Sequence, residues 1–71
     1  MDFQEIKKII NKCNHISIAD REIAFHYSEH AERYGLNILS DEACKLMMIE
    51  LNKNFHINNI NWFGIFYSRN K

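Results

Sequence analysis

The feature that most constrains the fold of this chain is the apolar stretch at its centre, residues 43–51, which directly follows a helix-start signal. Ser40 supplies a hydroxyl at the N-cap position. Asp41 and Glu42 then place two carboxylates where the helix macrodipole favours negative charge. This combination of cap, acidic first turn and apolar run predicts a helix over residues 41–55.

The predicted central helix is apolar on two sides. At about 3.6 residues per turn, six side chains share one broad face: Ala43, Cys44, Met47, Met48, Leu51 and Phe55. Leu46 and Ile49 lie on the other side, beside Lys45 and Lys53. A helix of this kind is either enclosed by neighbouring elements or presents its second side to a partner.

Three other segments are predicted to be helical. Residues 3–14 follow the potential cap Asp2 and repeat apolar side chains at helical spacing. A second helix is expected from residues 17–20 to residue 34, where Gly35 would provide the left-handed position that ends it. Residues 60–67 are expected to form a short fourth helix, although their aromatic residues also have strand propensity and could pair with residues 16–18 or 36–39.

We therefore predict an all-α fold, with residues 1–71 forming a single helical domain. It would be a small bundle of three to four short helices packed around the central third helix. A chain of 71 residues has room for only one core, and a core of this size rarely supplies more than about 3–5 kcal/mol of stability.

Composition and charge exclude several classes of protein. With 46% hydrophobic and 25% charged residues, the chain is a folded domain rather than a disordered segment. Its formal net charge of zero argues against a protein whose main task is to neutralise phosphates. No apolar run approaches the length of a membrane span. Cys13 and Cys44 without a secretory signal favour a reducing cytoplasm. Abundant Ile, Asn and Lys are typical of chains from A+T-rich bacteria, their phages and their plasmids, and we expect a phage or mobile element to encode the protein.

No catalytic or cofactor motif emerges from the residues. His26, Glu29 and His30 have a spacing that can hold zinc on a helix, but so short a chain leaves little room for a third ligand and a substrate cleft. The pattern contains no glycine-rich phosphate loop, and neither cysteine lies in a basic neighbourhood that would activate it. We expect no enzymatic activity, no cofactor and no small-molecule substrate.

The functional prediction is a small regulator or inhibitor that binds another protein or a second copy of itself. It depends on side chains left outside the predicted core pattern, since exposed apolar and aromatic residues often anchor interfaces. The predicted partner-binding residues are Phe25, Leu46, Ile49 and Trp62.

The alternative is a DNA-binding regulator of helix-turn-helix type, built from the second and third predicted helices. The acidic first turn, Asp41 and Glu42, argues against it, since base and phosphate contacts require Arg, Lys, Asn or Gln at that position.

Overall fold

The protein is a mixed α/β domain, seen in a computed structural model that describes residues 1–27 and 29–71. The all-α prediction is therefore wrong. In chain order the elements are α1 (Phe3–Lys12), β1 (His15–Ala19), β2 (Glu22–Tyr27), β3 (His30–Gly35), the short 3-10 helix η1 (Leu36–Ile38), α2 (Asp41–Asn54), β4 (Phe55–Asn61) and β5 (Gly64–Arg69).

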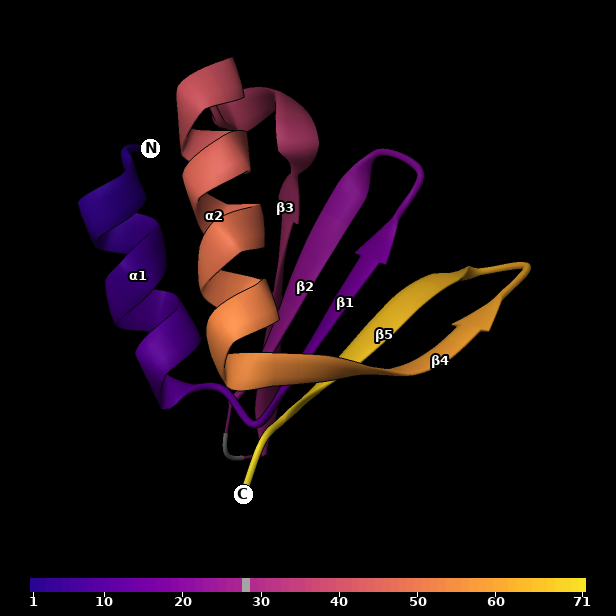
Figure 1. The fold of residues 1–71 in the computed structure, drawn as a ribbon. Coiled ribbons are helices and arrows are strands. Elements are labelled where there is room, and N and C mark those ends of the chain that lie inside the picture. The colour runs from indigo at the N-terminus through magenta and orange to yellow at the C-terminus, as the bar shows by residue number, and fades with distance from the viewer. Residues whose placement is uncertain (28) are drawn as a thin grey trace.

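The five strands form one antiparallel sheet in the order β3-β2-β1-β5-β4. Strand β1 lies at the centre, and β3 and β4 form the two edges. Figure 1 shows α1 and α2 side by side against one face of the sheet, while the β4–β5 hairpin extends away from the helices. The sheet therefore has a helix-covered face and an open face.

Both capped helices are confirmed. The Asp2 side chain accepts a hydrogen bond from the backbone N–H of Glu5, 3.0 Å away, at the start of α1. The Ser40 hydroxyl does the same for the N–H of Ala43, at 3.1 Å, at the start of α2. Such caps satisfy backbone donors that a helix leaves unpaired, so the signal is local and survives in any fold. No helix in the described residues is long and apolar enough to cross a membrane.

The predicted second helix is instead formed by strands. Residues 17–19 end β1, and β2 and β3 form a hairpin in which Tyr27 lies opposite His30. In β2, Ile23 and Phe25 point into the core with a period of two residues, and Ala24 and His26 point to the open face. The helix–turn–helix pair that the DNA-binding alternative needed is consequently missing its first helix.

Gly35 ends β3 rather than a helix, and its φ of −68° and ψ of 139° are those of extended backbone, which any residue can adopt. The predicted left-handed C′ position does not occur there.

The predicted fourth helix is also wrong. Residues 60–61 end β4 and residues 64–67 belong to β5, which pairs with β1 so that Ile16 lies opposite Tyr67 and Ile18 opposite Ile65. Central strands gain hydrogen bonds on both sides, and this tertiary pairing favours the strand in a segment whose helical prediction was weak. The aromatic strand propensity noted in the sequence is the signal that prevails.

Strand β4 contains a bulge that sets which way its side chains point. Ile57 pairs with Tyr67 and Asn59 pairs with Phe66, so Asn58 is an extra residue in the ladder. Without the bulge, strict alternation would turn Ile60 to the open face. With it, Ile57 and Ile60 share the helix-covered face, and Asn59 lies on the open face.

The core lies between the helices and the covered face of the sheet. Its fully buried members come from both layers: Ile6, Ile10, Cys13, Ile16, Ile23, Phe25, Met47 and Leu51. Phe25 and Tyr34 meet edge to face, with ring centroids 5.9 Å apart.

Arg69 fastens the end of β5 to the end of α1. Its guanidinium donates to the carbonyl oxygen of Ile10, in the last turn of α1, at 2.6 Å and to that of the C-cap residue Cys13 at 2.8 Å. The same guanidinium lies 4.6 Å from the centre of the Phe55 ring. A positive charge at a helix C-terminus is also favoured by the macrodipole.

The β4–β5 turn requires glycine at one position. Gly64 has a φ of +146°, which L side chains rarely adopt, and a Cβ there would lie 2.4 Å from the carbonyl oxygen of Ile18. The backbone of the hairpin therefore lies too close to β1 for any side chain at this position. Asn61 completes the turn, since its Oδ1 accepts a hydrogen bond from the N–H of Phe63 at 2.8 Å.

Gly64→Ala should destabilise the protein by roughly 2–3 kcal/mol, because it combines a strained φ with a backbone clash. The matched control is Gly35→Ala, whose added Cβ would meet the movable side chain of Asn37 at 2.6 Å and should cost less than about 1 kcal/mol. Urea unfolding followed by circular dichroism measures both. Equal losses in the two variants would contradict the close packing of β5 on β1.

Candidate functional site

The β4–β5 hairpin carries the most exposed apolar side chains of the described chain. Trp62 and Phe63 form the turn and are 96% and 76% exposed. Ile57 and Ile60 follow on the helix-covered side of β4, and Ile60 is 63% exposed because the helices do not extend over it. We call these four residues, Ile57, Ile60, Trp62 and Phe63, the hairpin surface.

The strand register extends this surface across the sheet. Ile60 lies opposite Ile65, and Ile65 lies opposite Ile18, so three isoleucines form a row over β4, β5 and β1. Ile65 and Ile18 are half-buried and pack against the core. The hairpin surface is thus continuous with the core rather than a set of isolated apolar residues.

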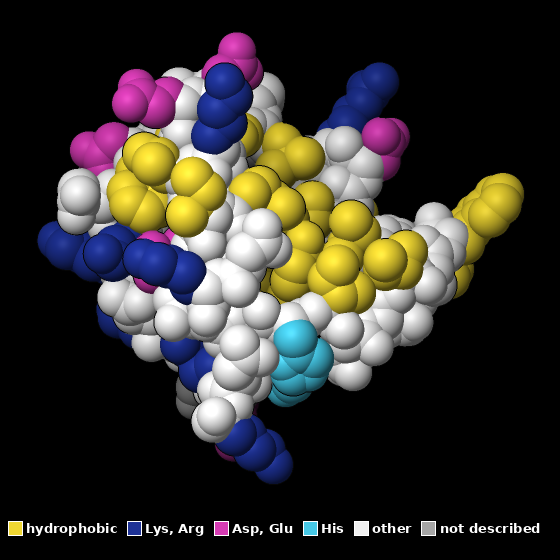
Figure 2. All heavy atoms as spheres, in the orientation of Figure 1, with side chains coloured by type: hydrophobic (Ala, Val, Ile, Leu, Met, Phe, Trp, Pro, Cys, Tyr) yellow, Lys and Arg dark blue, Asp and Glu magenta, His cyan; other side chains and the backbone are white. Residues whose placement is uncertain are grey.

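Figure 2 shows this arrangement as a continuous hydrophobic area over the region of β4 and β5, with a smaller hydrophobic group over the helices. A hydrophobic side chain also projects from the hairpin end, at the place of the β4–β5 turn in Figure 1. Contiguous apolar surface of this kind is uncommon on monomeric soluble proteins and marks binding sites.

The structure separates the four residues predicted to bind a partner. Phe25 is buried in the core, with 1% exposure, because it faces the helices from β2. Leu46 is half-buried and lines a shallow groove with Phe3 of α1. Ile49 is 56% exposed on the outer side of α2, and Trp62 lies at the hairpin turn. Only Trp62 belongs to the hairpin surface.

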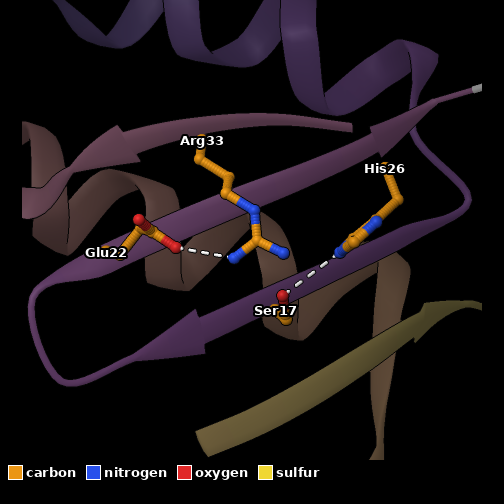
Figure 3. A network of polar contacts seen from close by, with 4 residues as sticks. All are labelled: Ser17, Glu22, His26 and Arg33. Carbon is orange, nitrogen blue, oxygen red and sulfur yellow. Dashed lines mark hydrogen bonds and ion pairs between the residues drawn. The ribbon is translucent and has the colours of Figure 1, made fainter. Parts of the chain in front are cut away.

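The open face of the sheet carries a polar network. His26 of β2 and Ser17 of β1 approach with 3.2 Å between Nε2 and Oγ. Arg33 of β3 reaches over β2 and donates to Glu22 at 2.8 Å. Figure 3 shows the Arg33 guanidinium between Glu22 and His26. This placement explains why Ala24, which lies opposite Arg33, is buried on a face that no helix covers.

Two effects lower the pKa of His26 below its ordinary value of 6.5. Partial burial disfavours the charged imidazolium, and the nearby positive charges of Arg33 and His15 disfavour it further. His26 is therefore a neutral imidazole at neutral pH. Among the described residues no carboxylate is hydrogen-bonded to its ring, so the nucleophile, base and orienting acid of a catalytic triad are not assembled around Ser17.

The histidine spacing noted in the sequence does not form a metal site. His26 lies on the open face, whereas His30 pairs with Tyr27 and lies on the covered face. No group of three or more metal-binding side chains occurs within residues 1–27 and 29–71. Cys13 and Cys44 are free thiols, and burial raises the pKa of Cys13 to about 11, which makes its thiol unreactive.

Comparison with known proteins provides no identification: no family model, no curated protein and no solved structure matches this chain significantly.

Ile57 and Ile60 were missed as surface residues by the sequence interpretation. The pattern in residues 55–61 contains the necessary signal, since apolar and polar residues alternate except at the doubled Asn58 and Asn59. Alternation interrupted by one additional polar residue is typical of a strand with a bulge.

The pKa of His26 can be measured by following its ring resonances by NMR, and we expect a value below 6.5. A double variant, Glu22→Gln with Arg33→Gln, should raise this pKa but leave it below 6.5, because burial is the larger cause. Removing both partners avoids exposing an unpaired Glu22 carboxylate to the imidazole.

The lowered pKa of His26 also predicts how stability depends on pH. Since the folded state disfavours the imidazolium, the contribution of His26 to stability is intact above about pH 6.5 and is lost as the pH falls through its folded pKa. His26→Gln should flatten this acid-side decline in unfolding experiments. An equally steep decline in the variant would assign it to another group.

Proposed function

We propose that this protein is a small, non-enzymatic regulator or inhibitor that binds another protein through the hairpin surface. The single observation that carries the proposal is the turn itself, where Trp62 and Phe63 are 96% and 76% exposed. Two-residue hairpin turns normally contain Asn, Asp or Gly, which fit the backbone at little cost. Two large aromatic side chains at this place contribute nothing to the core. Binding to a partner therefore explains them better than stabilisation of the fold does.

The turn presents these aromatic residues from a rigid base. The side chain of Asn61 holds the N–H of Phe63, and Gly64 allows β5 to contact the backbone of β1. Pre-organised side chains lose less entropy on binding than those of a flexible loop. Trp and other aromatic residues on such a base are the usual anchors of an interface.

The shape of the hairpin indicates what kind of partner fits it. The turn projects from the body of the molecule (Figure 1), so its anchors suit a partner with a concave apolar pocket. The adjoining row of Ile60, Ile65 and Ile18 offers a flatter apolar flank beside the anchors. We place this interaction in the cytoplasm, in keeping with the two free thiols, Cys13 and Cys44.

Trp62 provides a direct measurement, because it is the single tryptophan of the chain. In the free protein its emission should be that of a solvated indole, fully accessible to acrylamide. Binding of a partner should shift the emission to shorter wavelength and reduce acrylamide quenching, since the indole is then desolvated. Unchanged emission and quenching in a complex that has formed would show that the partner binds elsewhere.

The variant Trp62→Ser with Phe63→Ser should abolish binding and leave the circular dichroism spectrum unchanged, because neither side chain packs in the core. Ile38→Ser is the matched control, since Ile38 is an exposed apolar residue outside the hairpin surface and this variant should retain binding. Quantitative comparison of the proteins retained by each immobilised variant measures the difference. Equal retention by the double variant and the wild type would contradict the proposal.

Light scattering over a tenfold concentration range separates self-association from binding to a different protein. A dimer that dissociates in the Trp62→Ser/Phe63→Ser variant would identify the partner as a second copy of the chain. Ile49→Asp, on the outer side of α2, tests whether the interface extends to the helices.

A further inference from the structure

The open face of the sheet contains a depression that the hairpin surface does not involve. Its volume is about 430 Å³, within the range of small-ligand sites. It extends over β2, β1, β5 and β4, which are consecutive in the sheet. The side chains that matter for binding are Phe66, Ser17, His26, His15, Asn58 and Asn59. These residues lie on the side of the sheet opposite Ile60 and Ile65.

Phe66 provides an aromatic surface at the centre of this depression. It is only half-buried, and the register places it between Asn59 of β4 and Ser17 of β1. No helix covers this side of the sheet (Figure 1), so the Phe66 ring is open to a ligand. A flat ligand stacked on Phe66 would therefore have polar groups at both of its edges.

The hydrogen-bonding groups around Phe66 include donors and acceptors. On one edge are Ser17 and His26, whose side chains already lie 3.2 Å apart, and His15, which is directly opposite His26 in the register. On the other edge the bulge directs two consecutive amides, Asn58 and Asn59, to the depression. An amide presents one acceptor and two donors, which is a pattern that can pair with the edge of a heterocyclic ring.

The lining is free of formal charge. Among the described residues, the lining contains no Lys, Arg, Asp or Glu, and Arg33 on the same face is paired with Glu22. His26 is neutral at neutral pH because burial lowers its pKa. A charged ligand would lose its hydration without gaining a counter-charge, so the depression suits an uncharged ligand.

We propose that this depression binds a nucleobase, stacked on Phe66 and hydrogen-bonded through its edges to Ser17 on one side and Asn59 on the other. A nucleobase is planar, uncharged, and carries donors and acceptors around its rim, which matches each property of the lining. Stacking on an aromatic side chain accepts any base, and the amide and hydroxyl groups add selectivity. The base comes either from a free nucleoside or from an exposed position in a single strand.

Titration of the ¹⁵N-labelled protein, residues 1–71, with adenosine, guanosine, cytidine and uridine tests the proposal. We expect at least one nucleoside to cause saturable shifts in the cross-peaks of Ser17, Asn59 and Phe66, and ribose alone to cause none. A short single-stranded oligonucleotide that shifts the same cross-peaks would identify the single strand as a source, and its failure beside a binding nucleoside would identify the free nucleoside. Equal shifts with ribose, or none with any nucleoside, would overturn the proposal.

Three variants locate the ligand. Phe66→Leu keeps an apolar side chain but removes the ring, and should weaken binding about fivefold or more. Asn59→Ala should weaken it by a similar factor. His56→Gln, on the same face but outside the lining, should bind as the wild type does. Loss of binding in His56→Gln would overturn the assignment. Undiminished binding in Phe66→Leu, in a variant whose NMR spectrum shows that it is folded, would overturn it as well.

Trp62→Ser separates this inference from the proposed protein-binding role. An exposed tryptophan can stack on a base by itself, so binding that disappears in Trp62→Ser would place the ligand at the hairpin turn and overturn the proposal. Nucleoside binding that persists in Trp62→Ser, together with loss of protein binding in the same variant, shows two separate sites.

Discussion

The pairing of β1 with β5 holds the two hairpins of the sheet together. It joins the first hairpin of the chain, β1–β2, to the last, β4–β5, and so makes one sheet from residues about 50 positions apart. A two-stranded hairpin by itself is marginally stable in water. Arg69 adds a second tie, because it satisfies carbonyl groups of α1 from the end of β5. The exposed turn at Trp62 keeps its position because β5 is held both by its pairing with β1 and by the hydrogen bonds of Arg69.

The bulge in β4 explains how one strand serves two surfaces. It restores Ile60 to the helix-covered face after two consecutive asparagines, and this gives the hairpin surface its apolar flank. The same irregularity turns Asn58 and Asn59 toward the depression on the open face. Bulges commonly re-aim side chains next to functional sites. The hairpin surface and the depression on the open face therefore both depend on the bulge in β4.

The helices could be predicted from the sequence because their determinants are local. Asp2 and Ser40 cap α1 and α2 as expected, since a cap needs only the next three residues. Residues 17–34 were wrongly expected to be helical, because alanines and tyrosines there satisfy helical spacing while Ile23 and Phe25 satisfy strand spacing. Phe25 lies outside the helical spacing of these alanines and tyrosines, and this exception indicated a strand. Of the candidate site, Trp62 was predicted. The interrupted alternation of residues 55–61 is a local sign of the bulge, but the strand order that places Ile60 beside Ile65 and Ile18 joins distant segments, and no local pattern specifies it.

The two edges of the sheet differ in how they resist association with other chains. Edge β3 carries Glu32 and Arg33, and charged side chains discourage a further strand from adding to the ladder. Edge β4 reads Phe-His-Ile-Asn-Asn-Ile-Asn, without a carboxylate, lysine or arginine. Seven residues of this composition resemble segments that stack into cross-β fibrils.

A chain with zero net charge also lacks long-range repulsion near neutral pH. Colloidal stability in concentrated solution therefore depends on the bulge at Asn58, which interrupts an otherwise regular edge.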